Sequence, residues 1–342
     1  MKAHLLSKKS DLITERNPLE FSDVPIPELK DREILIKTKC CGVCHTELDE
    51  IEGRTPPLSY PVIPGHQVVG AVERLGNDVS EFKIGDRVGV AWIFSSCGTC
   101  DYCKNGFENL CPSFKATGRD ANGGYAEFMT VDSRFAYCIP AFFSDEQAAP
   151  LLCAGAIGYR SLKIASVTDG ESLGLCGFGG SGHQVLKMAR SLNPNSPIFV
   201  FARSAAERAF ALSLGATWVG DITEKPPVPL QAIIETTPAW NPIVQSLSNL
   251  KPGGKLVINA IRKETADKDS LMSLDYSRHL WMEKEIKSVA NITRHDVSEF
   301  LELAARIPLI PEIQTYPFEE ANQALWDLKN RHIQGSKVLV MK

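Results

Sequence analysis

The sequence predicts an α/β fold in which a doubly wound parallel sheet is inserted into a β-rich domain. Before residue 150, short segments of alternating apolar and polar residues are separated by Gly and Pro, which is typical of strands joined by tight turns. After Pro150, segments with the composition of strands and helices alternate, which predicts a parallel sheet. With 342 residues, 44% of them hydrophobic, the chain is long enough to form two domains.

The first part of the chain is expected to form several short strands. The segment 33–40 alternates between two faces, and similar segments follow at 68–75 and 87–91. Gly76-Asn77-Asp78 and Gly85-Asp86 mark tight turns between such strands. This part of the sequence therefore predicts a mainly antiparallel β structure.

The second part is expected to alternate strictly between strand and helix. The expected strands are 172–176, 198–201, 232–235 and 255–260, and the expected helices are 181–192, 205–214 and 242–250. Beyond about Ala290 the pattern returns to helix and short strand, and it ends in a strand at 336–341. We therefore divide the chain into residues 1–152, the first part of the β-rich domain, 153–289, the parallel-sheet domain, and 290–342, the second part of the β-rich domain.

Charge and hydropathy exclude two classes of partner. The formal net charge is −4, so no excess of Lys and Arg is present to neutralise the phosphates of a nucleic acid or an anionic membrane. No apolar run is long enough to cross a bilayer, and the start of the sequence lacks the apolar stretch of a secretory signal. These features predict a cytoplasmic protein that binds neither nucleic acid nor membrane.

Four of the ten cysteines lie in a short segment rich in turns: Cys97, Cys100, Cys103 and Cys111. A loop of this kind can present four thiolates to one Zn²⁺, and four thiolates leave no position for a substrate. The segment is therefore expected to hold a structural zinc that stabilises its lobe. The alternatives are four packed cysteines, which the polar residues between them oppose, and a nucleic-acid-binding zinc ribbon, which the acidic charge opposes.

A glycine-rich segment follows the strand expected at 172–176 and leads into the helix expected after it. Gly177, Gly179 and Gly182 match the pattern G-x-G-x-x-G in that context, and Gly180 lies between them. Glycines there permit a tight turn and bring backbone N–H groups close to the pyrophosphate of a dinucleotide. The segment predicts a Rossmann domain that binds NAD or NADP.

The residues after the strand at 198–201 bear on the choice between these cofactors. An NAD site usually has Asp or Glu there to accept a hydrogen bond from the ribose 2′-hydroxyl, whereas this chain has Ala202-Arg203-Ser204. Arg203 and Ser204 are able to bind a 2′-phosphate, which favours NADP. In the alternative, Arg203 stacks on the adenine and the cofactor is NAD, and the sequence leaves both interpretations open.

Three further segments contain potential metal ligands: Gly42-Val-Cys44-His45-Thr46, Gly65-His66-Gln67 and Leu151-Leu-Cys153-Ala-Gly155. Together with the four-cysteine loop and the glycine-rich turn, they resemble the zinc-containing medium-chain alcohol dehydrogenases over nearly the whole chain. The resemblance implies that Cys44, His66 and Cys153 hold a catalytic Zn²⁺, the Cys₂His ligand set already known for alcohol dehydrogenase. It also implies a GroES-like fold for the β-rich domain and two zinc ions per chain.

The resemblance assigns roles to three residues beside the catalytic zinc. His45 would contact the cofactor pyrophosphate, and Thr46 would take the alcohol proton, because its hydroxyl can donate and accept at once. Glu47 would accept a hydrogen bond from the ring of His66, at a position where the family usually has Asp.

Some positions depart from the family pattern. Gln67 replaces a common Glu and so removes a negative charge beside the zinc. Asp49 replaces the His that ends the proton relay, and it is either a proton acceptor linked to water or a solvated surface carboxylate. Ser336 replaces an Arg that binds cofactor phosphate in many relatives, and Lys337 is a doubtful substitute because neighbouring strand residues face opposite ways.

Together these features predict an enzyme that moves a hydride between a nicotinamide cofactor and a primary or secondary alcohol, or the corresponding aldehyde or ketone. Trp92, Ile93 and Phe94 match pocket positions of relatives, which favours apolar alcohols, and in the alternative these bulky side chains limit the size of the pocket. Two alternatives are a zinc-free quinone or enone reductase of the same superfamily and a non-enzymatic binding protein on this fold. The expected assembly is a homodimer or homotetramer.

Overall fold

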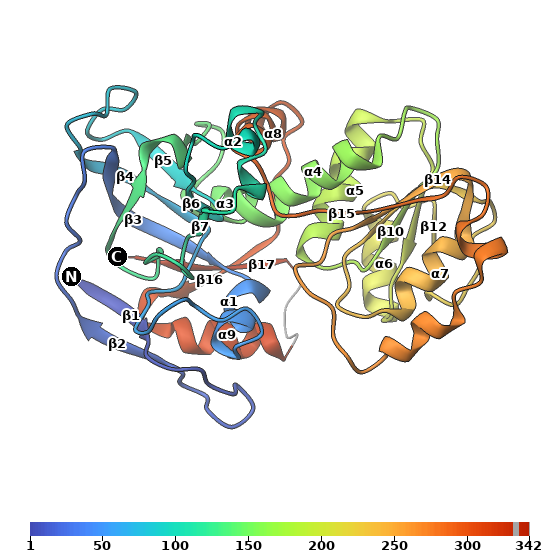
Figure 1. Ribbon diagram of the computed structural model, residues 1–342, viewed down its shortest axis with the longest axis horizontal. Helices are drawn as coiled ribbons and strands as arrows, with labels where there is room; N and C mark the ends of the chain where they lie inside the picture. Colours follow the sequence, from blue (N-terminus) through green and yellow to red (C-terminus); the bar gives the residue numbers. More distant parts are fainter. Residues whose placement is uncertain (331–334, 342) are drawn as a thin grey trace. The chain divides into compact units, whose positions relative to one another are not determined.

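The computed structural model describes residues 1–330 and 335–341. The chain forms two compact units, of which unit 1 comprises Met1–Cys153 and Ile292–Lys342, and unit 2 comprises Ala154–Asn291. Figure 1 shows that unit 1 is mainly β-sheet and that unit 2 has a sheet flanked by helices. The predicted α/β class, with a parallel sheet inserted into a β-rich fold, is confirmed.

Unit 1 is built on a seven-stranded sheet of order β16-β17-β3-β4-β5-β9, with β8 also paired to β3. Its strands are β3 (Glu33–Val43), β4 (Val68–Leu75), β5 (Arg87–Val90), β8 (Phe128–Asp132), β9 (Ala136–Cys138), β16 (Ile313–Pro317) and β17 (Ser336–Val340). The pairs are antiparallel except β16 with β17. β3 has neighbours on both edges and is almost continuously buried, so it forms the centre of this unit.

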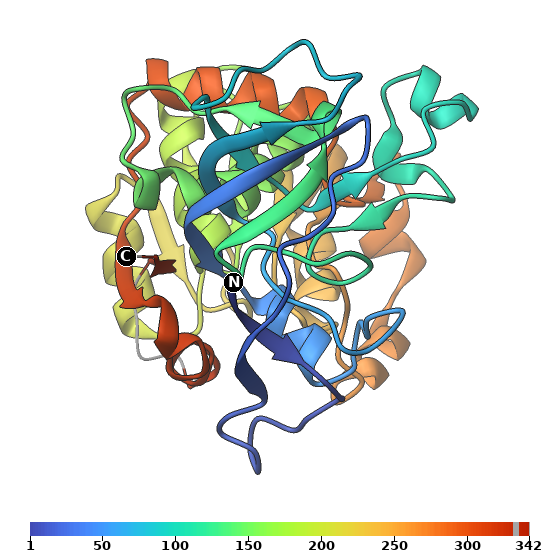
Figure 2. The same cartoon turned by 90° about the vertical axis from the view of Figure 1, so that its left-hand side faces the viewer.

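Two small sheets and several short helices complete unit 1. The sheets pair β1 (Lys2–Leu6) with β2 (Leu19–Asp23) and β6 (Ile93–Ser95) with β7 (Lys115–Ala116). The helices are α1 (His45–Ile51), α2 (Asp101–Lys104), α3 (Asp145–Pro150), α8 (Arg294–Arg306) and α9 (Ala321–Lys329), with 3₁₀ turns η1 (Glu108–Leu110), η2 (Ser133–Phe135) and η6 (Phe318–Glu320). The loop that carries α2, coloured teal, projects from the side of this unit in Figure 2.

Unit 2 contains a six-stranded parallel sheet of order β12-β11-β10-β13-β14-β15. Its strands are β10 (Leu173–Cys176), β11 (Ile198–Phe201), β12 (Trp218–Gly220), β13 (Leu230–Glu235), β14 (Leu250–Ile258) and β15 (Glu285–Ser288). The helices are α4 (Ala156–Ala165), α5 (Gly180–Leu192), α6 (Ala205–Ser213) and α7 (Asn241–Asn249), with a π-helical segment η5 (Tyr276–Leu280) and a 3₁₀ segment η4 (Lys268–Ser273). A further π-helical segment, η3 (Leu151–Gly155), begins in unit 1 and ends in unit 2. The strand order reverses between β10 and β13, and open α/β sheets bind ligands at the carboxyl edge of such a switch point.

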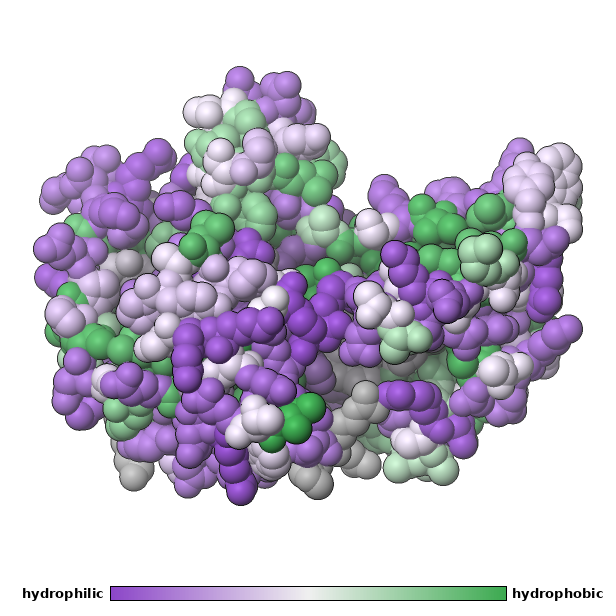
Figure 3. Space-filling model, turned by 60° about the horizontal axis from the view of Figure 1, so that its bottom comes forward, coloured by the Kyte–Doolittle hydropathy of each residue, from purple (hydrophilic) through white to green (hydrophobic). Residues whose placement is uncertain are grey.

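One face of the molecule is mainly polar. On the face drawn in Figure 3, hydrophilic residues predominate and hydrophobic residues form separate small groups. Within the described residues, no helix has the length and apolar composition that crossing a bilayer requires.

Candidate metal centres and nucleotide-binding turn

Cys44, His66 and Cys153 come together although they are far apart in the sequence. Cys44 precedes α1 as its N-cap residue, His66 lies in the loop before β4, and Cys153 lies in η3. One ligand atom from each residue, two sulfurs and a ring nitrogen, lies within 4.8 Å of the others. All three residues belong to unit 1, so a single compact unit forms this group.

Glu47 fixes the orientation of the His66 ring. Its Oε1 lies 2.5 Å from Nδ1 of His66, and its Oε2 accepts a hydrogen bond from the backbone N–H of Cys44 at 2.8 Å. Both side chains are buried. Nε2 of His66 is also buried and has no hydrogen-bond partner among the described residues. A buried nitrogen without a partner is unusual, and a metal ion would supply the missing interaction.

The group is also electrostatically suited to a cation. Contacts with Cys153 and His66 hold the pKa of Cys44 well below its usual range, although burial acts in the opposite direction. Burial alone would lower the pKa of His66, but the charge of Glu47 and the contact with Cys44 raise it well above its usual value. The lowered pKa of Cys44 therefore favours its thiolate beside His66, and two thiols with an imidazole are ligands that zinc prefers.

The other predicted residues of this region lie on α1. His45 is exposed, whereas Thr46 is buried and its Oγ1 lies 3.6 Å from the Sγ of Cys44. Asp49 is only 4% exposed, and its Oδ1 accepts a hydrogen bond from Nε of Arg54 at 2.6 Å. The alternative of a solvated surface carboxylate at Asp49 is therefore wrong, because α1 places this side chain inside unit 1 against Arg54.

The His66 ring contacts Trp92, which in turn contacts Arg119. The ring of Trp92 meets it edge to face, with centroids 5.2 Å apart and an angle of 89°. The guanidinium of Arg119 lies 5.4 Å from the Trp92 ring and forms two hydrogen bonds with Asp120, at 2.9 and 2.6 Å. Arg119 was not predicted, because an Arg in a turn-rich segment usually faces solvent.

Two buried side chains near the ligands carry polar atoms. Gln67 is 3% exposed, and a Cβ on Gly42 would lie 2.4 Å from its Oε1, so the amide fills the space that this glycine leaves. Glu50 is 1% exposed, and neither carboxylate oxygen has a hydrogen-bond partner among the described residues. Burial, together with the charge of Glu47, raises the pKa of Glu50 well above its usual value. Glu50 was not predicted, because a carboxylate on a short polar helix usually lies at the surface.

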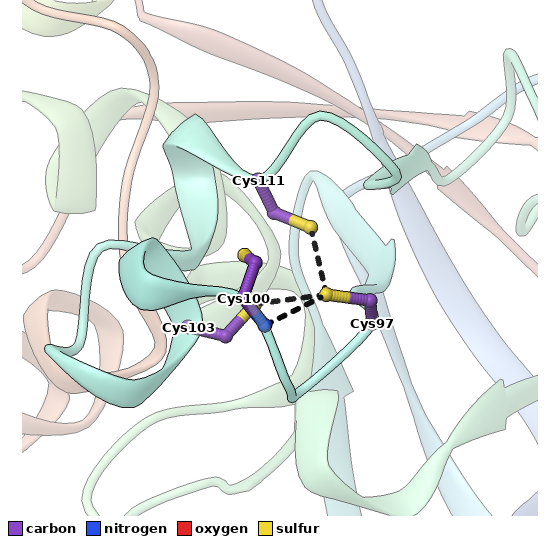
Figure 4. A group of neighbouring side chains, drawn as sticks. All are labelled: Cys97, Cys100, Cys103 and Cys111. Carbon is purple, nitrogen blue, oxygen red and sulfur yellow. Dashed lines mark hydrogen bonds between the residues drawn. The ribbon is translucent and has the colours of Figure 1, made fainter.

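The four cysteines of the second group also come together. One sulfur from each lies within 4.8 Å of the others, and the Sγ of Cys97 is 3.8 Å from that of Cys103 and 3.5 Å from that of Cys111. Figure 4 shows the four side chains pointing toward a common centre. Hydrogen bonds from the backbone of Thr99 and Cys100 lower the pKa of Cys97 to about 5, which favours its thiolate. Four thiols converging in this way suit a closed structural zinc site.

The four-cysteine loop is anchored to the last part of the chain. Glu108, in η1, is 1% exposed, and its Oε1 accepts hydrogen bonds from the backbone N–H of Arg294 at 2.5 Å and from its Nε at 3.1 Å. The Arg294 guanidinium also lies 5.4 Å from the ring of Phe135. The loop is therefore tied to the beginning of α8, 186 residues further along the chain.

The predicted dinucleotide motif forms the turn between β10 and α5. Gly177 has a φ of +88°, a conformation that favours glycine, and Gly179 is the N-cap residue of α5, whose first residue is Gly180. A Cβ on Gly182 would lie 2.6 Å from the carbonyl oxygen of Gly177, so this position has no room for a side chain. The turn lies at the carboxyl edge of β10, beside the point where the strand order reverses.

The segment after β11 also has defined contacts. Ala202 is buried, Arg203 is exposed, and Oγ of Ser204 accepts a hydrogen bond from the backbone N–H of Glu207 as the N-cap of α6. Arg208 donates to the carbonyl oxygens of residues 202 and 203, at 2.7 and 2.9 Å. Ser204 was predicted only as a phosphate ligand, although the pattern Ser204-x-x-Glu207 is a capping box that the sequence displays.

Comparison with known proteins decides the family. Residues 30–141 match the family model described as alcohol dehydrogenase GroES-like domain. The Mycobacterium tuberculosis protein named "Probable alcohol dehydrogenase AdhA" is 42% identical over 332 residues, which cover 96% of this chain and 94% of that protein. This chain belongs to the zinc-containing medium-chain alcohol dehydrogenase family. The predicted family is thus confirmed.

Solved structures of other dehydrogenases have the same fold. A cinnamyl alcohol dehydrogenase from Sorghum bicolor is 28% identical and covers 99% of this chain, 98% of its own, with a TM-score of 0.85. The protein CAD from Helicobacter pylori, solved in complex with NADP(H), is 25% identical and covers 99% of this chain, 97% of its own, also with a TM-score of 0.85.

One departure from the family pattern has a structural explanation. Lys337 is 2% exposed, and its Nζ donates a hydrogen bond to the hydroxyl of Tyr316 at 3.2 Å inside unit 1. Burial lowers the pKa of Lys337 to about 8. Its ammonium is therefore engaged inside the unit, which leaves it unsuited to replace the phosphate-binding Arg that the family often has at position 336.

Proposed function

We propose that this protein is a zinc-dependent alcohol dehydrogenase that transfers a hydride between an alcohol, or the corresponding aldehyde or ketone, and NAD or NADP. The observation that carries the proposal is the group formed by Cys44, His66 and Cys153, in which the buried Nε2 of His66 has no partner among the described residues. Its relatives are named alcohol dehydrogenases, which supports the same reaction here.

The residues present fit a catalytic zinc and a structural zinc. Cys44, His66 and Cys153 would hold the first ion, and the cysteines at 97, 100, 103 and 111 would hold the second. When bound by three protein ligands, zinc supplies Lewis-acid chemistry to the oxygen of the alcohol or carbonyl substrate. Glu47 contributes by fixing the tautomer and the orientation of His66.

The chain's own residues would then handle the proton and the cofactor. The Thr46 hydroxyl accepts the alcohol proton while it donates its own proton onward, and the buried carboxylate of Asp49, one turn further along α1, takes part in the release of a proton to water. Arg54 orients that carboxylate. The glycine turn from Gly177 contributes to binding of the pyrophosphate. His45 is exposed at the start of α1, and its contact with the cofactor stays a prediction.

Zinc analysis and activity measured on one preparation test the proposal. We expect two zinc ions per chain and reduction of NAD or NADP that depends on alcohol, measured with primary, secondary and aromatic alcohols. Zinc-independent reduction of an enone or quinone would instead support a reductase of the same superfamily. One zinc per chain without turnover of any alcohol, aldehyde, ketone or enone would support a binding protein.

Cofactor choice leads to a separate prediction at Ala202 and Arg203. The wild type is proposed to accept NADP, because Ala202 presents no charge to a 2′-phosphate and Arg203 is exposed beside it. Ala202→Asp adds a carboxylate that accepts from the 2′-hydroxyl and repels the phosphate. A cost of about 1–3 kcal/mol would lower kcat/KM for NADP roughly 5- to 150-fold, and Arg203→Ala should act in the same direction.

The measurement is kcat/KM for both cofactors in the wild type and the two variants. The capping residue Ser204 is left intact in both, so α6 keeps its N-cap. An unchanged ratio of NADP to NAD efficiency in both variants would show that this segment does not contact the ribose.

We also propose that the protein forms a homodimer or homotetramer. The edge strand β15 is exposed along its whole length and carries the exposed Ile286, and large apolar side chains that precede it in the sequence are exposed as well: Ile261, Tyr276, Trp281 and Met282. An open strand edge with such neighbours is a common place for pairing with a second chain. Light scattering of the purified protein measures the mass directly, and a monomer would contradict the proposal.

A further inference from the structure

A buried ion pair lies at the carboxyl edge of the parallel sheet in unit 2. Glu235 is the last residue of β13 and is fully buried, and its carboxylate pairs with the ammonium of Lys263, whose side chain is 9% exposed. The register aligns Glu235 with Cys176, at the end of β10, and with Ile258, at the end of β14. The pair thus lies at the same edge of the sheet as the end of β10, where the glycine turn begins.

Lys263 uses its ammonium to hold the segment that follows β13. Besides the carboxylate of Glu235, it donates to the carbonyl oxygens of Thr237 at 2.7 Å and Ala239 at 3.1 Å. Glu235 in turn accepts from the backbone N–H of Thr237 at 2.7 Å and from its hydroxyl. All three protons of the ammonium therefore have acceptors in residues 235–239.

The segment held by Lys263 packs directly against the glycine turn. Oγ1 of Thr236 donates to the carbonyl oxygen of Cys176 at 3.0 Å, as does its backbone N–H at 2.9 Å. A Cβ on Gly177 would lie 2.5 Å from Oγ1 of Thr236 and 3.0 Å from Cγ2 of Thr237. The backbone of the turn therefore rests on residues 236 and 237 with no intervening space.

Other contacts between the same two loops surround this pair. The backbone N–H of Glu264 donates to the carbonyl oxygen of Pro238 at 2.7 Å. Oδ2 of Asp267 accepts from the backbone N–H groups of Trp240 and Asn241, at 2.9 and 2.8 Å. Among these contacts, the positive charge comes from the buried ammonium of Lys263. Removing it would leave the Glu235 carboxylate buried without its counterion.

We propose that Lys263 is a positioning residue for the nucleotide: through Glu235 and residues 236–237, it fixes the backbone of the turn at Gly177 that receives the pyrophosphate. The inference rests on the proposed role of that turn in binding NAD or NADP. A positioning role predicts a defect in nucleotide affinity. Hydride transfer should remain close to normal once the cofactor is bound, because Lys263 and Glu235 contact neither predicted zinc group.

The test compares the zinc-loaded wild type with Lys263→Met, Lys263→Arg and Lys255→Met. Lys255 is the matched control, because it lies on β14 of the same unit and pairs with Glu285 at 3.5 Å, but near the surface. For Lys263→Met we expect the Kd for NADPH and for NADH, measured by fluorescence titration, to rise about 10-fold. The kcat at saturating cofactor should stay within about twofold of the wild type. Lys263→Arg should recover much of the affinity, and Lys255→Met should bind as the wild type does.

Each other outcome is informative. Unchanged Kd values in folded Lys263→Met, or an equal loss of affinity in Lys255→Met, would overturn the inference. If Lys263→Met does not fold, Glu235→Gln replaces it, and weaker nucleotide binding of that variant is again required. Failure of the wild type to bind either nucleotide would refute the proposed function and, with it, this inference, whereas wild-type binding with unaltered variants refutes the inference alone.

Discussion

Replacing either of two ligands of the catalytic site, in Cys44→Ser or in His66→Ala, is expected to abolish alcohol turnover while the chain remains folded. Each change removes one of three residues that would hold the zinc. Lewis-acid catalysis of this kind contributes several kcal/mol, and 1.4 kcal/mol is a factor of ten, so kcat/KM should fall about 1,000-fold or more.

The fold should survive because the two changes leave the main supports of unit 1 in place. Cys44 is the N-cap of α1, and serine is among the most favourable residues at that position, so Cys44→Ser preserves the start of the helix. The four-cysteine loop is a separate group and should keep its zinc. Metal analysis should therefore fall from two zinc ions per chain to one, with far-UV circular dichroism unchanged.

Matched controls separate ligand loss from a general effect of substitution. Cys138→Ser changes an exposed cysteine outside both metal groups, and His295→Ala changes a largely exposed histidine on α8. Both should retain full activity and two zinc ions. Near-normal activity of Cys44→Ser or His66→Ala would instead show that the group does not hold a catalytic metal.

Periodicity in the sequence was most informative for the parallel sheet. Strand 198–201 was predicted with the bounds that β11 has, and helix 181–192 differs from α5 by one residue at its start. Such elements can be predicted because strand and helix segments alternate strictly and glycine-containing turns separate them. The exposed β15 had no alternating pattern, so it was not predicted, and its strand conformation follows from pairing with β14.

Only those residues of the candidate site that belong to short sequence motifs could be predicted. The ligand types and the role of Glu47 came from short segments that resemble the family, and the structure places those residues within contact of one another. The partner of Glu108 depends on folding, because Arg294 is 186 residues from Glu108. Burial of Glu50 likewise follows from the packing of α1, and a polar helix sequence does not indicate it.

Cys103→Ser is expected to have the largest effect on stability. Cys103 is buried, and its Sγ lies 3.8 Å from that of Cys97, so the substitution opens a closed set of four thiolates. Metal binding at a structural zinc site contributes directly to folding free energy. Loss of about 3 kcal/mol would lower the Tm of a unit of this size by about 6–12 °C.

The effect should reach beyond the loop because Glu108 ties the loop to α8. Without zinc, η1 is no longer held in place, and Glu108 then loses its two hydrogen bonds with Arg294 at the beginning of that helix. Thermal unfolding measured with metal analysis tests this, with Cys138→Ser as the control that should keep the wild-type Tm. Catalytic activity below the unfolding transition should change little, since Cys44, His66 and Cys153 are untouched. A wild-type Tm in Cys103→Ser, with two zinc ions still bound, would show that the four cysteines do not form a structural metal site.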